Sequence, residues 1–480
     1  MVEKRQFYIN GGWVNPAAAN DHAVIDPSNE EPCAVISLGD EADTDAAVAA
    51  ARAAFPAWMN TPPSARIALI EKLLGIYQSR SEDMAKAISL EMGAPIDMSR
   101  QQQVGAGLGH IKSLIRAGKA YQFDAPLGDH APGDRILHEP VGVCALITPW
   151  NWPMNQITLK VIAALIAGCT MVLKPSEESP LSALIFAEMV DAAGFPPGVF
   201  NLLNGDGAGV GSQLSAHAGV DMISFTGSSR AGRLISKSAA NTLKRVSLEL
   251  GGKGANLIFA DADEKAVKRG VMRCMNNTGQ SCNAPTRMLV QREIYDRAVE
   301  TAADVANSIN VGPAGIEGNH IGPVVNAVQF KKIQRLIQKG IDEGARLIAG
   351  GTGRPHGLNR GYYVKPTVFA DVSNEMTIAV EEIFGPVLSI IPFGSEEDAI
   401  AIANDTPYGL TNYVQTGDPA RANRVARALR SGMVEMNGLS RGAGAPFGGM
   451  KQSGNGREGG VWGIDDFIEV KSVSGWTEGL

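Results

Sequence analysis

The chain has 480 residues, 44% of them hydrophobic and 19% charged, with a formal net charge of −7. This length exceeds what one hydrophobic core fills, so we expect two or three domains of ordinary globular composition. The absence of any basic run argues against a nucleic-acid partner, and the longest apolar stretch, 161–173, is too short to span a bilayer, so no membrane partner is expected.

Cysteine and histidine usage narrows the compartment and the chemistry. The five cysteines form no C-x-x-C pair, and their odd number leaves at least one outside any intramolecular disulfide. A reducing cytoplasm is the natural location for such a chain, and the N-terminal segment lacks the apolar core of a signal peptide. The seven histidines share no ligand spacing with a cysteine, so we expect no metal site.

The first part of the chain predicts a helical layer followed by an irregular excursion. Apolar residues recur at helical spacing over 46–59 and 64–92, with Asp and Ser available as caps. Residues 123–140 are polar and interrupted by Pro and Gly, which is atypical of a core element.

From residue 141 the chain alternates between strand and helix patterns. Segment 141–150 reads as a buried strand, 158–168 as a helix and 169–176 as a second strand, which is the order of a βαβ unit. The alternation continues through strands at 199–205 and 221–227 and a helix that begins at Ser229. This order predicts a doubly wound parallel sheet of the kind that binds dinucleotides.

After Gly251 the same alternation starts again. A strand is predicted at 256–260, a helix at 263–276 and a strand at 287–291, and further units follow to about residue 450. The restart predicts a second α/β domain. Near the chain end, 467–476 alternates apolar and polar residues as a strand does.

Three segments contain side chains that can perform chemistry. Cys282 lies in a Gly- and Asn-rich loop (277–287) between a helix and a strand, where backbone N–H groups can favour the thiolate. Glu249 stands at a strand end among apolar neighbours, where desolvation raises a carboxyl pKa toward the range of a general base. Asn151, in the turn ITPWNWP (147–153), can donate to an oxyanion. An inert cysteine, a structural acid and an ordinary turn residue are the alternatives.

A nucleotide site is indicated less directly. FTGSSRAG (225–232) places a strand, Gly227 and a helix N-terminus in sequence, and such a terminus receives a pyrophosphate. Its spacing is neither that of the dinucleotide fingerprint nor that of a P-loop, and NGDGAGVG (204–211) also departs from both. Lys174 and Glu177 follow a strand and can meet a ribose, although a solvated charge pair is the alternative.

Taken together, these segments resemble the aldehyde dehydrogenase superfamily over about residues 7–475. The motifs that carry the resemblance occur in the family's order: TPWNWP (148–153), KPSE (174–177), FTGSSRAG (225–232), LELGGK (248–253), NTGQSC (277–282), EEIFGP (381–386), PYGL (407–410) and PFGGMKQSGNGRE (446–458).

The resemblance implies an α/β fold with two doubly wound parallel-sheet domains and a small β oligomerisation arm. By position, the coenzyme-binding domain would comprise 1–118 and 141–250, and the catalytic domain 251–450. The arm would comprise 119–140 and 463–480 and would assemble a homo-oligomer, a dimer or a tetramer. The partner implied for the active site is a small-molecule aldehyde.

Roles follow position by position from the resemblance. Cys282 corresponds to the nucleophile, Glu249 to the general base and Asn151 to the oxyanion donor. The cofactor would be held by Thr148, Pro149, Trp150, Lys174, Ser176, Glu177, Gly207, Phe225, Thr226, Gly227, Ser228, Leu250, Gly251, Glu382 and Phe384. The substrate tunnel would be lined by Trp152, Gln156, Leu159, Asn276, Ser281, Asn283, Arg441 and Phe447.

The implied reaction is NAD(P)-dependent oxidation of an aldehyde to the acid through a thiohemiacetal and a thioester on Cys282. Glu177 favours NAD, because a carboxylate repels a 2′-phosphate, while Arg230 leaves NADP open. A cofactor-independent ester or thioester hydrolase with the same cysteine, and a non-catalytic structural member, are the alternatives. An acylating, CoA-dependent enzyme is disfavoured because Glu249 provides the route through water.

The tunnel positions predict an uncharged substrate. Succinate-semialdehyde members of the family resemble this chain but place Arg where Leu159 and Asn276 stand, and betaine-aldehyde members place Trp at the Leu159 position. We therefore expect medium aliphatic or aromatic aldehydes. Arg441 is the exception: pointing inward it would favour an acidic aldehyde, although a lone Arg in a Gly-rich loop is more often solvated or bonded to backbone carbonyls.

Overall fold

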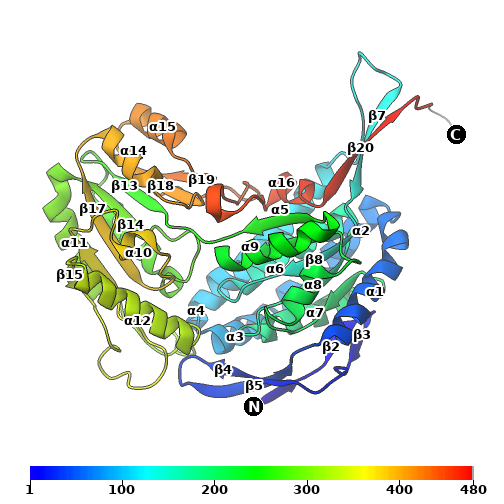
Figure 1. Cartoon of the computed structure of the whole chain (residues 1–480), viewed down its shortest axis with the longest axis horizontal. Helices are drawn as coiled ribbons and strands as arrows, with labels where there is room; N and C mark the ends of the chain where they lie inside the picture. Colours follow the sequence, from blue (N-terminus) through cyan, green and yellow to red (C-terminus); the bar gives the residue numbers. More distant parts are fainter. Residues whose placement is uncertain (478–480) are drawn as a thin grey trace.

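Two seven-stranded sheets, one in each of two lobes, organise the computed structural model, which describes residues 1–477 (Figure 1). The lobe drawn in blue to green carries the first sheet, and the lobe drawn largely in yellow and orange carries the second (Figure 1). The expected arm segment 463–480 thus has its last residues, 478–480, outside the described part of the chain.

The first sheet is parallel except at one edge. Its strands lie in the order β12 (Arg245–Glu249), β11 (Met222–Thr226), β8 (Val143–Ile147), β9 (Thr170–Lys174), β10 (Phe200–Leu202), β2 (Phe7–Ile9) and β3 (Gly12–Val14). β2 pairs antiparallel with both β10 and β3. Every residue of β8, β9 and β11 is buried, as expected for a parallel sheet covered on both faces.

The helices of this lobe pack on that sheet and on each other. They are α1 (Glu41–Met59), α2 (Pro63–Ser79), α3 (Ser81–Met92), α4 (Ile96–Met98), α5 (Val104–Ala120), α6 (Pro153–Ala167), α7 (Pro180–Ala193), α8 (Val210–Ala216) and α9 (Ser229–Ala239), with a π-helical turn η1 (Ser99–Gln103) and a 3₁₀ turn η2 (Ala240–Thr242). α6 shows why such a segment is helical. It begins with Pro153, which needs no N–H partner, and ends at Gly168, whose φ of 98° suits glycine.

The second sheet repeats the arrangement. Its order is β15 (Arg346–Ala349), β16 (Thr367–Ala370), β17 (Val387–Phe393), β14 (Arg287–Gln291), β13 (Ala255–Ile258), β18 (Thr411–Gln415) and β19 (Met433–Met436). Only β15 pairs antiparallel. The helical elements of this half are α10 (Ala266–Met275), η3 (Asn276–Gly279), η4 (Arg292–Ile294), α11 (Tyr295–Asn307), α12 (Ala327–Asp342), α13 (Thr377–Val380), α14 (Glu396–Asn404) and α15 (Pro419–Ala428). The chain then continues through η5 (Lys451–Ser453) to α16 (Gly460–Asp465), which packs on α5 and α6 of the first lobe.

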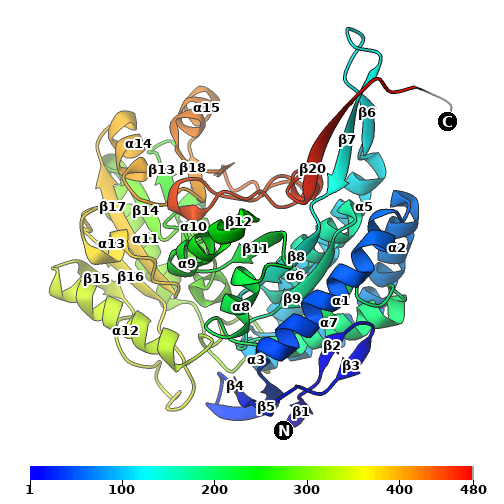
Figure 2. The ribbon, with the colours of Figure 1, turned by 45° about the vertical axis from the view of Figure 1, so that its right-hand side comes forward.

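Two small sheets complete the chain. β1 (Val2–Lys4), β5 (Glu31–Ser37) and β4 (Asp21–Asp26) form one near the N-terminus. β20 (Ile468–Ser474) pairs antiparallel with β7 (Asp134–Pro140), which pairs in turn with β6 (Asp124–Pro126). Figures 1 and 2 both show β7 and β20 projecting away from the two lobes.

The predicted fold class is confirmed, with differences of detail. The helical pattern over 64–92 is two helices, because the chain turns at Arg80, whose Nη1 donates to Glu188 on α7 at 2.9 Å. Apolar periodicity continues across that turn since both helices bury residues in the same core. The antiparallel edge strands β2 and β3 were not expected, because strands of three residues carry too little alternation to detect. The N-terminal sheet was not predicted either.

Candidate active site

The carboxyl ends of neighbouring parallel strands gather the predicted motifs at one edge of the first sheet. Ile147 of β8 lies in register with Phe225 of β11, and Thr226 lies in register with Glu249 of β12. The turns that follow these three strands therefore emerge side by side. Such an edge is where doubly wound sheets bind ligands.

Cys282 follows a strained turn. Asn277 and Thr278 have φ of 51° and 57°, in the left-handed region that non-glycine residues rarely adopt. The amide of Asn277 donates to the carbonyl of Asn151 at 2.9 Å, and the hydroxyl of Thr278 donates to the carbonyl of Gly322 at 3.0 Å. These bonds hold the strained backbone, and strain of this kind collects at functional sites.

The Cys282 thiol is not the preformed thiolate that the sequence suggested. Burial, together with the carboxyl groups of Glu382 and Glu249, raises its pKa to about 12. The backbone N–H of Cys282 does favour the thiolate, but desolvation and the nearby acids outweigh it in the free protein.

Glu249 is buried at the end of β12, with 2% of its surface exposed. Both carboxyl oxygens lack a hydrogen-bond partner among the described residues. Burial, and then the nearby Glu458, raise the pKa of Glu249 well above its usual range. An unpartnered buried acid of this kind is costly, and it is a group suited to taking a proton from a ligand or water.

A buried ion pair lies near Glu249 and was not predicted from the sequence. Lys160 of α6 donates its Nζ to Glu458 at 2.6 Å and to the hydroxyl of Ser224 at 3.0 Å. In the sequence, Glu458 stood out only as the last residue of a motif. Nothing in the sequence indicates that it lies beside Lys160, almost 300 residues earlier in the chain.

Asn151 is buried and firmly held. Its Nδ2 donates to the carbonyl of Gln280 at 2.9 Å, and its own carbonyl accepts from Gln103 at 3.1 Å. One hydrogen of the amide is used in this way, so the second is left for a ligand. The bond to Gln280 fixes the Asn151 side chain against the loop that contains Cys282.

Cys282 lies where two cavities meet. One cavity, of about 150 Å³, is lined by Asn151, Gln156, Cys282, Gln329 and Lys332 together with nine predicted cofactor residues: Pro149, Trp150, Thr226, Gly227, Ser228, Leu250, Gly251, Glu382 and Phe384. The other, of about 340 Å³, is lined by Cys282 and by all eight predicted tunnel residues: Trp152, Gln156, Leu159, Asn276, Ser281, Asn283, Arg441 and Phe447. We call these the cofactor-side and substrate-side cavities.

The cofactor-side cavity has the chemistry to hold the nicotinamide and pyrophosphate part of a dinucleotide. A Cβ at Gly251 would collide with the Glu382 carboxylate, so only glycine allows this close approach. The N-terminus of α9, capped by the Ser228 hydroxyl, opens on this cavity and suits a pyrophosphate. Phe384 has φ of 62° and meets the Trp150 ring edge to face, with centroids 5.5 Å apart.

Six further predicted cofactor residues lie outside the lining of this cavity. Lys174 is buried, and its Nζ donates to the carbonyls of Pro175 and Gly205 and lies 3.6 Å from Glu177, so the pair is not simply solvated. Phe225 packs under Gly227 instead of facing the cavity. The others, which surround the same strand ends, are Thr148, Ser176, Glu177 and Gly207.

The substrate-side cavity contains polar side chains that the sequence did not single out. They are His110 on α5, Asn155 on α6 and Arg273 on α10, and the His110 ring bonds Asn155 at 2.7 Å. Arg441 is neither solvated nor bonded to a carbonyl as expected. Its Nε lies 3.3 Å from Glu435, and its guanidinium covers the Phe447 ring, because a buried carboxylate outcompetes water for it.

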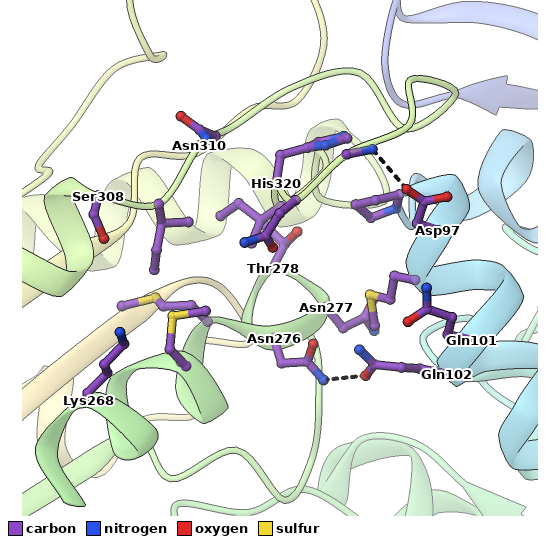
Figure 3. A pocket seen from close by; sticks show the side chains of 18 residues that line it. Asp97, Gln101, Gln102, Lys268, Asn276, Asn277, Thr278, Ser308, Asn310 and His320 are labelled. Atoms are coloured by element: carbon purple, nitrogen blue, oxygen red, sulfur yellow. Dashed lines mark hydrogen bonds between the residues drawn. The ribbon is translucent and has the colours of Figure 1, made fainter. Parts of the chain in front are cut away.

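A further cavity, of about 510 Å³, lies behind the turn that precedes Cys282 (Figure 3). Asn276, Asn277 and Thr278 line it, and the amide of Asn276 donates to Gln102 at 2.9 Å. Asn276 also lines the substrate-side cavity, so this bond lies between the two spaces.

The described residues 1–477 contain no helix with the length and apolar character needed to cross a bilayer. Within the same residues, no three His, Cys, Asp or Glu side chains are grouped to hold a metal ion.

Comparisons with known proteins agree on one family. The family model described as the aldehyde dehydrogenase family matches residues 13–473. A 3-succinoylsemialdehyde-pyridine dehydrogenase from a Pseudomonas species is 51% identical over 99% of each chain. The crystal structure of an aldehyde dehydrogenase from Bartonella henselae has 59% identity and a TM-score of 0.98, covering 99% of this chain and 100% of that one. A cysteine-to-alanine mutant of aldehyde dehydrogenase C from Pseudomonas syringae, solved with NAD+ and octanal, has 48% identity and a TM-score of 0.97, covering 99% and 97%.

Proposed function

The chain belongs to the aldehyde dehydrogenase family and oxidises aldehydes with a nicotinamide cofactor, and we propose that Cys282, Glu249 and Asn151 carry this reaction. The observation that supports the assignment best is that Cys282 lines both the cofactor-side and the substrate-side cavity. A nucleophile at that junction can hold a substrate carbon next to a bound cofactor.

Covalent capture is the first step of the proposal. The Cys282 thiol gives up its proton to solvent, the sulfur bonds to the aldehyde carbon, and the carbonyl π electron pair moves to oxygen. The free hydrogen of the Asn151 amide and the Cys282 backbone N–H stabilise this oxyanion. A bound nicotinamide supplies the hydride acceptor, and Cys282 then carries a thioester.

Hydrolysis of the thioester is assigned to Glu249. Its unpartnered carboxylate takes a proton from water, the oxygen attacks the thioester carbon, and the acid leaves as the Cys282 sulfur regains a proton. The ion pair of Lys160 and Glu458 lies close enough to act on the Glu249 pKa, so this proton remains in a polar network.

NAD is the proposed cofactor in preference to NADP. Glu177, with 29% of its side chain exposed, stands after β9 where a ribose is expected, and its carboxylate would repel a 2′-phosphate. Arg230 is exposed at the start of α9 and leaves some NADP use possible.

Uncharged aldehydes of medium size are the proposed substrates. Trp152, Leu159 and Phe447 give the substrate-side cavity apolar surface, and Gln156, Asn276 and Asn283 offer neutral hydrogen bonds. The relatives named above for a pyridine semialdehyde and crystallised with octanal support the same class.

The proposed oligomer, a dimer or a tetramer, assembles through β6, β7 and β20. The outer edge of β20 has no paired strand among residues 1–477, and Val470 and Trp476 are 66% and 41% exposed. A projecting sheet of three strands is marginal alone and suits pairing with a second copy. Light scattering that found a stable, active monomer would contradict this.

A cytoplasmic location is proposed from the thiols. All five cysteines, each within the described residues, are free. Free thiols of this kind persist in a reducing compartment.

The decisive experiment traps the thioester. Glu249→Gln protein is mixed with NAD and hexanal, quenched in acid and digested, and peptides are analysed by mass spectrometry. We expect an acyl group on Cys282 and one NADH per active site. Acyl modification at another residue, or NADH formed without it, would refute the assignment. Acid release in the absence of a nicotinamide would instead indicate a hydrolase.

A further inference from the structure

Two arginines share one buried carboxylate on the wall of the substrate-side cavity. Nη2 of Arg273 lies 2.8 Å from one oxygen of Glu435, and Nε of Arg441 lies 3.3 Å from the other. The Glu435 side chain is 5% exposed, whereas those of Arg273 and Arg441 are 37% and 28% exposed. The cluster therefore has two positive charges and one negative charge, and its cationic members reach the cavity.

Aromatic rings hold both guanidinium groups in place. Arg273 lies over Tyr413 at 5.3 Å, and Arg441 lies over Phe447 at 4.8 Å. Glu435 accepts one hydrogen bond from each, and the Arg273 guanidinium also bonds to the Tyr413 hydroxyl. The terminal N–H groups of Arg441 have no acceptor within residues 1–477. Stacked guanidiniums lose little freedom when they bind, so these N–H groups are ready donors.

We propose that Arg273 and Arg441 form a subsite that binds a hydrogen-bond acceptor at the end of the substrate remote from the aldehyde. The inference rests on the proposed function, because the same cavity must hold the aldehyde at Cys282. It assigns this enzyme to medium-length aldehydes that end in a carbonyl or a ring nitrogen. Plain alkyl and phenyl aldehydes of the same size fill the cavity but leave these donors unpaired.

A neutral acceptor suits this subsite better than a carboxylate. Glu435 already takes one bond from each arginine, so a second carboxylate would lie near the first. Moving a carboxylate out of water is costly, and one net positive charge that is partly exposed to solvent offsets little of that cost. A neutral carbonyl or ring nitrogen gains the hydrogen bond without either penalty.

The cluster also makes a structural contact, and the experiment must distinguish its effect from that of substrate binding. The Tyr413 hydroxyl donates to the carbonyl of Asn283, next to Cys282, at 2.6 Å. Changing Arg273, which covers Tyr413, could thus disturb the nucleophile. Arg441 has no such connection, and its removal leaves Glu435 paired with Arg273. Arg441→Met is therefore the informative variant.

The experiment compares two aldehydes that differ by one ring atom. kcat/KM is measured with NAD for 4-(pyridin-3-yl)butanal and 4-phenylbutanal. We expect the wild type to prefer the pyridyl aldehyde roughly tenfold, as one charge-assisted hydrogen bond provides. Arg441→Met should abolish this preference and bring the ratio of the two kcat/KM values close to one. Arg346→Met is the matched control, because Arg346 on the edge strand β15 pairs with an acid in the same way, with Asp371 at 2.6 Å, but lines neither the substrate-side nor the cofactor-side cavity.

Each other outcome overturns the subsite. Equal kcat/KM values for the two ring aldehydes in the wild type would mean that the subsite does not recognise an acceptor. An equal decrease of kcat/KM for both aldehydes in Arg441→Met would show that Arg441 has a purely structural role. A third arm uses 6-oxohexanoate against hexanal: a larger preference there, abolished in Arg441→Met, would replace the neutral acceptor with a carboxylate. In all these cases oxidation of 4-phenylbutanal keeps the proposed function intact. If neither ring aldehyde nor hexanal is oxidised, the proposed function fails and the subsite fails with it.

Discussion

The two cavities that meet at Cys282 are built differently. More than half of the residues that line the cofactor-side cavity come from short segments at the ends of β8, β11 and β12, and Gln329, Lys332, Glu382 and Phe384 complete it from later in the chain. The substrate-side cavity takes side chains from α5, α6, α10 and the loop that contains Arg441. The sheet edge thus holds the part that binds a constant cofactor, whereas helices and loops hold the part that selects a substrate. Substitutions at the junction should stop the reaction. Substitutions within one cavity should alter only the use of the ligand that occupies that cavity.

The largest effect is expected for Cys282→Ser, at the junction. A serine hydroxyl is far less acidic than a thiol and a much weaker nucleophile at neutral pH, so aldehyde oxidation should fall by roughly a thousandfold or more. NAD binding, measured by calorimetry, should persist because the cofactor-side cavity is otherwise unchanged. Near-normal NADH formation by the variant would mean that another residue is the nucleophile.

Glu249→Gln should affect the second half of the reaction more than the first. An amide cannot take a proton from water, so steady-state turnover should fall on the order of a hundredfold. The first turnover should still release NADH as a burst in stopped-flow absorbance. Asp45→Asn, on the surface of α1, serves as a control, and an unchanged steady state in Glu249→Gln would assign the base elsewhere.

The pH dependence of Cys282 alkylation tests the raised pKa of this thiol. With a pKa of about 12, the thiolate is a small minority at pH 7 and grows about tenfold per pH unit. Alkylation of the cofactor-free protein by iodoacetamide should rise accordingly from pH 7 to 9. Cys282→Ser provides the background from the other thiols. A plateau below pH 9 would show that the free protein already holds a thiolate.

The smallest effect is expected at Glu177, on the cofactor side alone. Glu177→Ser removes the carboxylate that opposes a 2′-phosphate, so kcat/KM for NADP should rise several-fold to about tenfold relative to NAD. The relative rates for different aldehydes should not move. Glu264→Ser, an exposed acid in the other lobe, is the control. An unchanged cofactor ratio would remove Glu177 from the ribose site.

Prediction from the sequence was most successful for residues that lie directly after the end of a strand. The alternation of buried strands and helices predicted both sheets. Of the nine residues that the resemblance assigned to the cofactor and that line the cofactor-side cavity, seven lie at the ends of β8, β11 and β12, and Glu382 and Phe384 follow α13. It was less successful for side chains on helices. His110, Asn155 and Arg273 lie in ordinary helical patterns, and their cavity exists only once α5, α6 and α10 pack together.

The sequence by itself determined the class of fold and the family, and it supplied the proposal of which side chains react. These depend on local patterns, namely apolar runs, glycine-rich turns and short motifs, which are contained in the linear order of the residues. Only the tertiary structure decided the electrostatics. The raised pKa values of Cys282 and Glu249, the Lys160–Glu458 pair and the sharing of Glu435 by Arg273 and Arg441 arise between residues far apart in the chain. Desolvation and Coulomb interaction depend on distance and burial in space, so no local pattern encodes them.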